Sequence, residues 1–344
     1  MHISEIYVYP IKSLQPTRLT EATITRHGIL YDRCFMLLKV VDDAPNNWLK
    51  NMHVPEFPQM SLFLTELVLS EEKNGKIIVT YQEPPVSSCR NPRTLEIPLQ
   101  PGLDGLEEIS ITMHQSPIVG YNMGSKYSDW FSDCFGFRVV LAYTGQNRRR
   151  VLGSMNPNIR REGWLSTLTT YVPRLGPGHG KDEKEEGILT FADCAAYMVV
   201  NDMSVKQVAS RFPEGHGGVE VTRFRPNLVV GGAESAWEED FWAELSLGGG
   251  DVQLVLTSNC VRCRSLDVDF DTGGFHKTDD GMVYKKLNKD RRVDKGAKYS
   301  PVFGRYGFLK GDVVVAKIRV GDAVRVDKTA TERTTFDWPV SHCP

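Results

Sequence analysis

Residues 3–13 read ISEIYVYPIKS, and this stretch sets the pattern for the whole chain. Ile3 to Tyr9 is a short run rich in β-branched and aromatic residues, which predicts a strand. Pro10 ends the run, so Lys12 and Ser13 follow on a turn. An ammonium group beside a hydroxyl suits a phosphate or another oxyanion, although a lysine on a turn is also typical of an exposed surface.

Similar short runs recur along the chain, separated by clusters of Gly, Pro, Asn and Asp. Their composition predicts strands at 34–40, 62–69, 76–81, 109–113, 137–143, 227–230, 252–257, 313–318 and 323–326. Because long helical patterns are few, we expect a mainly β chain with a few helices (α+β). Its strands are expected to form β-barrel or sandwich units rather than an alternating βαβ sheet.

Two segments have helical periodicity, and both apolar faces are predicted to pack into the core. In the first, Ser125 is the expected cap, Gly136 follows the end, and the apolar face comprises Tyr127, Trp130, Phe131 and Cys134. In the second, Ser204 and Gln207 have capping-box form, and the face comprises Val205, Val208, Ala209 and Phe212.

The character of the sequence changes between 145 and 187, which holds three consecutive arginines, Pro- and Gly-rich sequence and a charge run at 181–186. This composition predicts a long solvated loop, with an acidic partner for the arginines as the alternative. We therefore expect an N-terminal β-barrel-like domain at 1–145 packed on a β-barrel domain at 188–330. An insertion at 146–187 separates them, and a C-terminal tail occupies 331–344.

The overall composition excludes several classes of protein. The chain has 344 residues, of which 41% are hydrophobic, as expected of about two folded domains. Its net charge of −2 argues against nucleic-acid binding through a global positive field, and no apolar run approaches the roughly 20 residues of a transmembrane segment. Without a signal- or transit-peptide pattern, and with seven scattered cysteines, the chain is expected to be cytoplasmic.

The sharpest local motif is Cys260-Val261-Arg262-Cys263. A structural zinc site needs four ligands, and only His276 and His342-Cys343 follow. A thioredoxin-type pair sits at a helix N-terminus, but acidic and apolar residues alternate after Cys263, which is typical of a strand or turn. The third alternative is a single thiolate ligand for a soft transition metal, with Arg262 favouring the ionised sulfur. The motif by itself leaves all three open.

Three further motifs contain an arginine: GILYDR at 28–33, FRPN at 224–227 and SPVFGRY at 300–306. In the first, Arg33 beside an aspartate is either part of a site or a structural ion pair. In the second, the planar fork of Arg225 suits a phosphate or carbonyl group, and Asn227 can both donate and accept. The third is predicted as a turn that ends in an arginine and Tyr306.

Taken together and in this order, these segments resemble the MOSC superfamily, preceded by its N-terminal β-barrel domain. Among its members they are most similar to the mitochondrial amidoxime-reducing components and their bacterial homologues. The resemblance extends from Ile3 to about Val326 and rests on six motifs in register: YPIKS, GxxYDR, FRPN, CxRC followed by DxDTG, SPxFGxY and VGD.

The resemblance implies that Cys263 is the catalytic protein ligand to molybdenum. It also implies that Mo-molybdopterin is contacted by Lys12, Ser13, Arg33, Asp193, Arg225, Asn227, Arg262 and Tyr306. Four of these residues are cations, which would offset the negative charge of the cofactor. The chain departs from the family at Phe270, where proline is common, and at Arg264, which adds a cation beside the metal ligand.

The implied function is a molybdenum-cofactor oxidoreductase that reduces N-hydroxylated small molecules. Because the sequence has no Rossmann, flavin or c-type haem motif, electrons are expected from a separate protein. By resemblance this donor is of the cytochrome b5 type, with its NADH-dependent reductase. The alternatives are a non-catalytic molybdopterin-binding or carrier module and a CxxC thiol redox protein.

Overall fold

The computed structural model describes residues 1–41, 48–69, 75–155, 157, 188–213, 218–311 and 315–339. Strands dominate this part of the chain, and its α-helices are α1 (Ser125–Phe135), α2 (Asp202–Ala209) and α3 (Val283–Leu287). The expected mainly β fold with a few helices is confirmed. The charge run at 181–186 and residues 340–344 of the tail, which include His342 and Cys343, lie outside the described residues.

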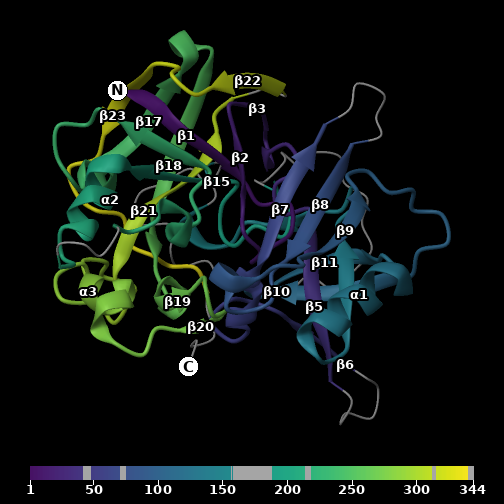
Figure 1. Ribbon diagram of the computed structural model, residues 1–344. Coiled ribbons are helices and arrows are strands. Elements are labelled where there is room, and N and C mark those ends of the chain that lie inside the picture. Colours follow the sequence, from purple (N-terminus) through teal and green to yellow (C-terminus); the bar gives the residue numbers. More distant parts are fainter. Residues whose placement is uncertain are drawn as a thin grey trace.

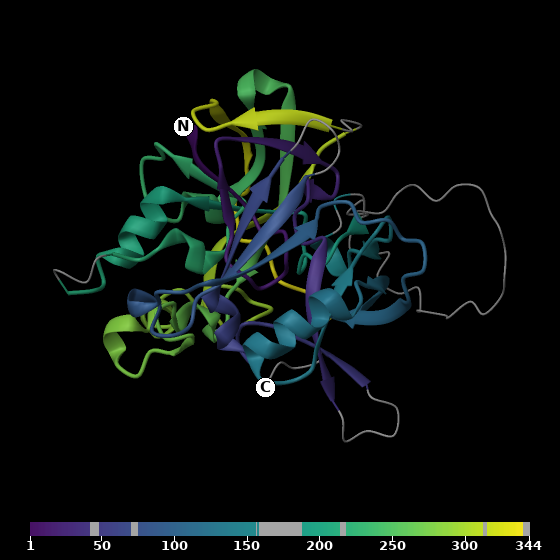
Figure 2. The ribbon, with the colours of Figure 1, turned by 45° about the vertical axis from the view of Figure 1, so that its right-hand side comes forward.

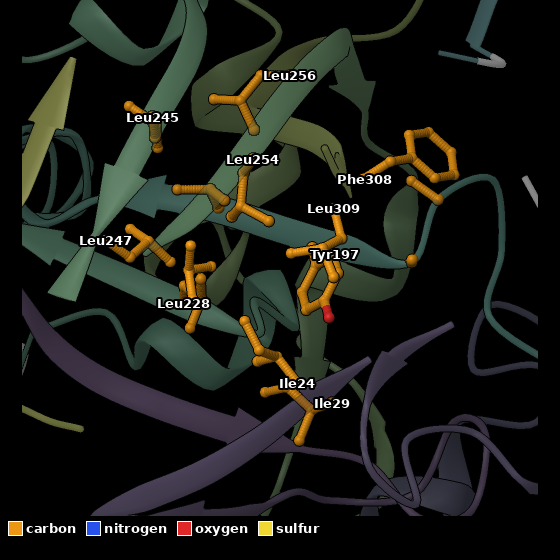
Figure 3. Close-up of a cluster of buried hydrophobic side chains, with 14 of the residues drawn as sticks. Ile24, Ile29, Tyr197, Leu228, Leu245, Leu247, Leu254, Leu256, Phe308 and Leu309 are labelled. Atoms are coloured by element: carbon orange, nitrogen blue, oxygen red, sulfur yellow. The ribbon is translucent and has the colours of Figure 1, made fainter. Parts of the chain in front are cut away.

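An eight-stranded sheet forms the lobe on the left of Figure 1. Its strands, in spatial order, are β2 (Thr17–Leu19), β1 (His2–Val8), β16 (Leu228–Gly231), β15 (Tyr197–Asn201), β21 (Val302–Leu309), β18 (Val252–Val261), β17 (Trp242–Leu247) and β23 (Val324–Thr329). The sheet curls around an apolar core in which Leu228, Leu245, Leu254 and Tyr197 are buried (Figure 3).

The N-terminal strand β1 belongs to this largely C-terminal sheet, as its purple ribbon among the green strands shows (Figure 1). It pairs antiparallel with β16, so that Ile6 lies opposite Leu228. Because the strands are antiparallel, the end of β1 lies beside the beginning of β16. The turn at 10–13 therefore meets the FRPN segment, although more than 200 residues separate them in sequence.

The N-terminal region forms a nearly closed barrel around a second apolar core. Its larger sheet has the order β10 (Glu108–Met113), β11 (Ser116–Asn122), β12 (Val139–Tyr143), β5 (Phe35–Val41) and β6 (Trp48–Asn51). A second sheet consists of β7 (Phe63–Val68), β8 (Lys76–Tyr81) and β9 (Arg93–Pro98). Helix α1 lies alongside these strands (Figure 2), and its Phe131 is buried in their core.

Shorter elements connect these sheets. The remaining strands are β3 (Glu21–Thr25), β4 (Gly28–Ile29), β13 (Arg149–Arg150), β14 (Ile188–Leu189), β19 (Val268–Asp269), β20 (Gly274–Phe275) and β22 (Val315–Arg319). The 3-10 helices are η1 (Pro58–Leu62), η2 (Val86–Ser88), η3 (Gly153–Met155), η4 (Val221–Phe224), η5 (Glu238–Phe241), η6 (Gly248–Gly250), η7 (Arg264–Asp267) and η8 (Asp279–Gly281). Within the described residues, none of the helices is both long and apolar enough to span a bilayer.

Both predicted helices are present, but their N-terminal caps differ from the prediction. Ser125 is the first residue of α1 rather than its cap, which is Gly124. In α2 the cap is Asn201, whose side chain accepts a hydrogen bond from the backbone N–H of Met203. Ser204 lies inside that helix and donates to Glu239 at 2.8 Å. The predicted capping box is therefore wrong, because a distant carboxylate takes the serine hydroxyl.

The prediction of a turn for residues 300–306 is also wrong in most of its length. From Val302 onward these residues form β21, a strand that pairs with β15 on one side and β18 on the other. Burial on both faces of the sheet explains the apolar character of this segment, in which Val302 and Phe303 are fully buried.

Candidate functional site

Lys12 is buried at the junction of the two lobes. Its side chain is 10% exposed, and its ammonium group forms an ion pair with Asp193. The backbone N–H of Lys12 donates to the carbonyl of Phe35 at 2.8 Å, which fixes the turn against β5. Burial lowers the pKa of Lys12, while the negative charge of Asp193 opposes that shift. The interpretation of Lys12 as an exposed surface lysine is therefore wrong.

Asp193 is held by two residues that the sequence analysis did not assign to the site. His114 lies in the turn between β10 and β11, and its Nε2 is 3.2 Å from Asp193 Oδ1. Arg149 is 1% exposed and donates to the backbone carbonyls of Ala192 and Asp193. Burial would raise the pKa of Asp193, but Lys12 and His114 hold it well below its usual range.

The solvated-loop prediction for the three arginines is consequently wrong for Arg149. Its guanidinium fixes the loop that presents Asp193, because the backbone carbonyls of that loop need donors inside the protein. No sequence signal distinguished Arg149 from its neighbours, of which Arg150 is exposed and Arg148 half-buried. His114 had a detectable signal, a two-residue connection between alternating strands.

Arg33 and Arg225 converge on the ring of Tyr9. Their guanidinium carbons lie 4.2 and 4.4 Å from the ring centroid, within the range of cation–π interactions. Arg33 pairs with Asp32 and donates to the backbone carbonyl of Arg225 at 3.3 Å. Arg225 in turn donates to the carbonyl of Leu14 at 2.9 Å. The GILYDR, FRPN and YPIKS motifs thus meet in one place.

Asn227 connects these motifs through its side-chain amide. Its Oδ1 accepts from Arg33 Nη1 and from the backbone N–H of Met198, each at 3.1 Å. Its Nδ2 donates to the carbonyl of Tyr7 at 3.2 Å. Asn227 is 1% exposed, so its contacts serve mainly to position Arg33 and to join β1 to β15.

Three residues of this junction adopt left-handed backbone conformations. Their φ angles are 71° at Ser13, 48° at Arg33 and 55° at Arg225. Each such residue costs on the order of 1 kcal/mol, and residues of this kind concentrate at functional sites. The strained backbone holds all three side chains in fixed directions before any ligand binds.

The two cysteines of the CxRC motif have different environments. Cys260 is buried within β18, where its Sγ accepts a hydrogen bond from Arg262 Nη1 at 3.0 Å. Cys263 is exposed just beyond the end of β18, with its Sγ 3.2 Å from Ser265 Oγ. Both are free thiols. Of the pair, Cys263 is the sulfur that an incoming metal can reach.

The surroundings of the CxRC motif bear differently on its three alternatives. Among the described residues, no three His, Cys, Asp or Glu side chains gather as a metal site, so zinc gains no support there. The short 3-10 helix η7 follows Cys263, rather than the long α-helix of a thioredoxin-type pair. A single exposed thiolate is the alternative that this geometry favours.

The segment that follows Cys263 meets the turn at 10–13 and the end of the FRPN-containing segment. One small pocket is lined by Ser13 and Arg225 together with Ser265, two residues beyond Cys263. Burial opposes the charge of Arg262, but nearby Cys260, Tyr306 and Cys263 raise its pKa. Burial has the opposite effect on Tyr306, because it disfavours the ionised hydroxyl and raises the pKa of Tyr306 well above its usual range.

We call Lys12, Arg33, Arg225 and Arg262 the cation cluster. Lys12 pairs with Asp193, Arg33 pairs with Asp32, and Arg225 lies near both carboxylates, whereas Arg262 lies beside Cys260 and Cys263. The four cations therefore exceed these two carboxylates by two. In addition, the buried Nε of Arg262 has no hydrogen-bond partner among the described residues. This arrangement fits an anionic group that carries about two negative charges, and it fits the phosphate of molybdopterin.

Comparison with known proteins agrees with the order of the motifs and the fold. The family model of the MOSC N-terminal beta barrel domain matches residues 1–138, and that of the MOSC domain matches residues 186–325. The chain belongs to the MOSC-domain family. It carries both domains that the resemblance predicted.

Relatives of known name fall into two groups. Mitochondrial amidoxime reducing component 2 of Macaca fascicularis is 23% identical over 335 residues, covering 94% of this chain and 82% of that protein. Mitochondrial amidoxime-reducing component 1 of Mus musculus is 25% identical, covering 94% of this chain and 81% of that protein. Molybdenum cofactor sulfurase of Homo sapiens is 23% identical, covering 85% of this chain but only 29% of that protein.

Proposed function

We propose that this MOSC-domain protein is an oxidoreductase that binds the molybdenum cofactor and reduces N-hydroxylated compounds. The observation that carries the proposal is a buried surplus of positive charge from both lobes, one member of which, Arg262, lies next to the exposed thiol of Cys263. The names of the amidoxime-reducing relatives support the choice of substrate class. At 23–25% identity they support it as a class only.

The residues that would hold the cofactor follow from their chemistry. The Cys263 thiolate would ligate the metal, and the cation cluster would bind the phosphate and the polar pterin. Ser13 and Tyr306 would add hydroxyl groups at the edge of the same region. When bound, the cofactor supplies the two-electron chemistry that removes oxygen from an N–O bond. The overall reaction is R–NH–OH + 2 e⁻ + 2 H⁺ → R–NH₂ + H₂O.

The reaction consumes two protons, and one partly exposed side chain of the site, His114, is of a type that transfers protons in enzymes. Asp193 has a half-exposed side chain, and His114 Nε2 lies 3.2 Å from it. Because Lys12 and His114 keep the pKa of Asp193 low, this carboxylate stays ionised at neutral pH and orients the imidazole of His114 instead of carrying a proton itself.

Electrons are proposed to come from a separate cytochrome b5-type protein and its NADH-dependent reductase, since the sequence lacks a nicotinamide, flavin or haem motif of its own. We also propose a cytoplasmic location. The cysteines within the described residues are all free thiols, which is typical of a reducing compartment.

The test is elemental analysis and turnover of benzamidoxime by protein made in a host that synthesises the cofactor. We expect about one molybdenum per chain, and we expect Cys263→Ser to lower the turnover rate at least 100-fold. Cys134→Ser, which changes a half-buried thiol on α1, is the matched control and should retain activity. Protein without molybdenum, or an active Cys263→Ser variant, would overturn the proposal.

The sulfurase relatives support a second candidate, a non-catalytic molybdopterin-binding or carrier protein. In those proteins the matching module is less than a third of the chain. A carrier would contain molybdenum but would not reduce benzamidoxime, even with a chemical reductant. It would also restore activity to a molybdenum-free reductase when the two proteins are mixed.

A further inference from the structure

A second cavity adjoins the cation cluster at Asp32, which lines the cavity and pairs with Arg33. Its volume is about 460 Å³, within the range of small-molecule sites. It is bounded by the β3–β4 turn, the segment at 99–103 and the turn at 145–148. Lys12, Arg225 and Cys263 do not line it, so it is distinct from the proposed cofactor site.

The wall of this cavity is largely apolar. Leu99 and Tyr143 are buried on its inner side. Leu30 and Val315 lie at the cavity with 39% and 61% of their surface exposed. Apolar side chains that remain exposed beside a cavity favour a ligand that covers them with an apolar body.

One cationic group in the cavity is only partly used by the protein. Arg148 donates through Nη1 to the carbonyls of Gly145 and Asn147, at 3.0 and 2.7 Å. Its Nε is buried and has no hydrogen-bond partner among the described residues. Because this Nε is shielded from solvent, an acceptor in the cavity would instead meet the rest of the half-buried guanidinium, which can add a charge-assisted hydrogen bond to it.

The one carboxylate among the described residues that line the cavity is already paired with other groups of the protein. Asp32 lines the cavity, but its carboxylate pairs with Arg33 and accepts from the backbone N–H of Tyr9 at 2.8 Å. Arg26 and His27 also line the cavity. The cavity therefore combines apolar walls with a cationic donor whose charge is not matched within it.

We propose that this cavity binds a small carboxylate with an apolar body. The carboxylate accepts from Arg148, and the apolar body covers Leu30, Leu99 and Tyr143. This assignment does not depend on the proposed function, because none of the residues that define it belongs to the cation cluster.

The probe is 4-phenylbutyrate, compared with 4-phenylbutan-1-ol, which has the same apolar body and no charge. Isothermal titration calorimetry with the full-length protein should show 1:1 binding of the carboxylate, at least tenfold tighter than that of the alcohol. Arg148→Met should remove this difference. Arg150→Met is the matched control and should bind like the unmodified chain, because Arg150 is exposed and does not line the cavity.

A second variant keeps the test decisive if Arg148→Met folds poorly. Leu30→Asp places a carboxylate at the partly exposed edge of the cavity and should weaken 4-phenylbutyrate binding at least tenfold. Leu64→Asp, at a position on β7 that is 42% exposed, should leave binding unchanged. The absence of binding at millimolar probe, equal affinity for acid and alcohol, or unaltered binding by Leu30→Asp would each overturn the proposal.

Discussion

The molecule contains two buried groups of cations, and their partners differ. The cation cluster has four positive charges for two carboxylates, and Arg225 has backbone carbonyls as its hydrogen-bond acceptors. At η5, Arg291, Arg305 and Arg333 surround Asp240, which belongs to this 3-10 helix; we call this group the arginine network. Arg291 contacts both carboxylate oxygens of Asp240 at 2.7 and 2.9 Å, and Arg333 donates to Oδ2 at 2.7 Å.

The arginine network has acidic groups of the protein as its partners. Besides Asp240, the carboxyl groups of Glu239 and Asp294 act on Arg305, and burial raises the pKa of Glu239 to about 7, so three cations face two carboxylates and one carboxyl group that is largely protonated below neutral pH. Arg305 also donates to Asn259 Oδ1 at 2.7 Å. The comparison shows that buried arginines alone do not mark a binding site. The cation cluster differs in that its positive charges outnumber the carboxylates around them by two, and in that an exposed thiol lies beside it.

The largest effect is expected from breaking the arginine network. Asp240→Ala leaves two arginines without their carboxylate in the protein interior, which should lower the free energy of unfolding by about 3–5 kcal/mol. Urea unfolding measures this loss. Asp251→Ala, at an exposed turn, is the control and should change little. A loss as small as that of the control would show that the network does not stabilise the fold.

An intermediate effect is expected from Glu239 through pH. Burial raises its pKa to about 7, so the folded state holds a proton that the unfolded state releases near pH 4.5. The free energy of unfolding should therefore fall by about 2 kcal/mol as the pH rises from 5 to 7. In the Glu239→Gln variant, this decrease in the free energy of unfolding between pH 5 and pH 7 should be absent, as measured by urea unfolding at the two pH values. An equal decrease in the variant would show that Glu239 is not its source.

The smallest effect on stability is expected within the cation cluster. Arg225→Met loses hydrogen bonds to backbone carbonyls but also removes a buried charge, whose cost is evident because burial lowers the pKa of Arg225 to about 10. The free energy of unfolding should change by only about 1 kcal/mol. If the proposed function is correct, molybdenum content measured on the same samples should fall at least tenfold. A loss of stability like that of Asp240→Ala would instead make Arg225 a structural residue.

Runs rich in β-branched and aromatic residues predicted many of the strands, because such side chains pack well on a half-buried sheet, but β9, β11, β15 and β17 were not predicted. The run at 76–81 coincides with β8, and the first strand differs from β1 only at its ends. The predicted helix caps failed for a different reason. A serine hydroxyl can serve a helix terminus or a distant partner, and in Ser204 the distant partner Glu239 takes it.

The motifs also predicted which residue types gather at the candidate site, but not how each is used. Asn227 was expected to face a ligand, yet its amide is largely occupied by Arg33, Met198 and Tyr7. Arg149 was missed because it stands in no motif, and His114 was missed although it lies in a recognisable two-residue hairpin turn. Their roles depend on the loop that carries Asp193, which is remote from both in sequence.

The sequence by itself determined the β character of the chain and the order of its motifs, and it singled out the CxRC motif without deciding among its alternatives. These are encoded in short stretches, through side-chain periodicity and local backbone preference. Only the tertiary structure decided that the turn after the first strand meets the FRPN segment, since that contact depends on the antiparallel pairing of β1 with β16. The excess of positive charge likewise exists only after folding, because it is a property of how the side chains of distant segments are brought together.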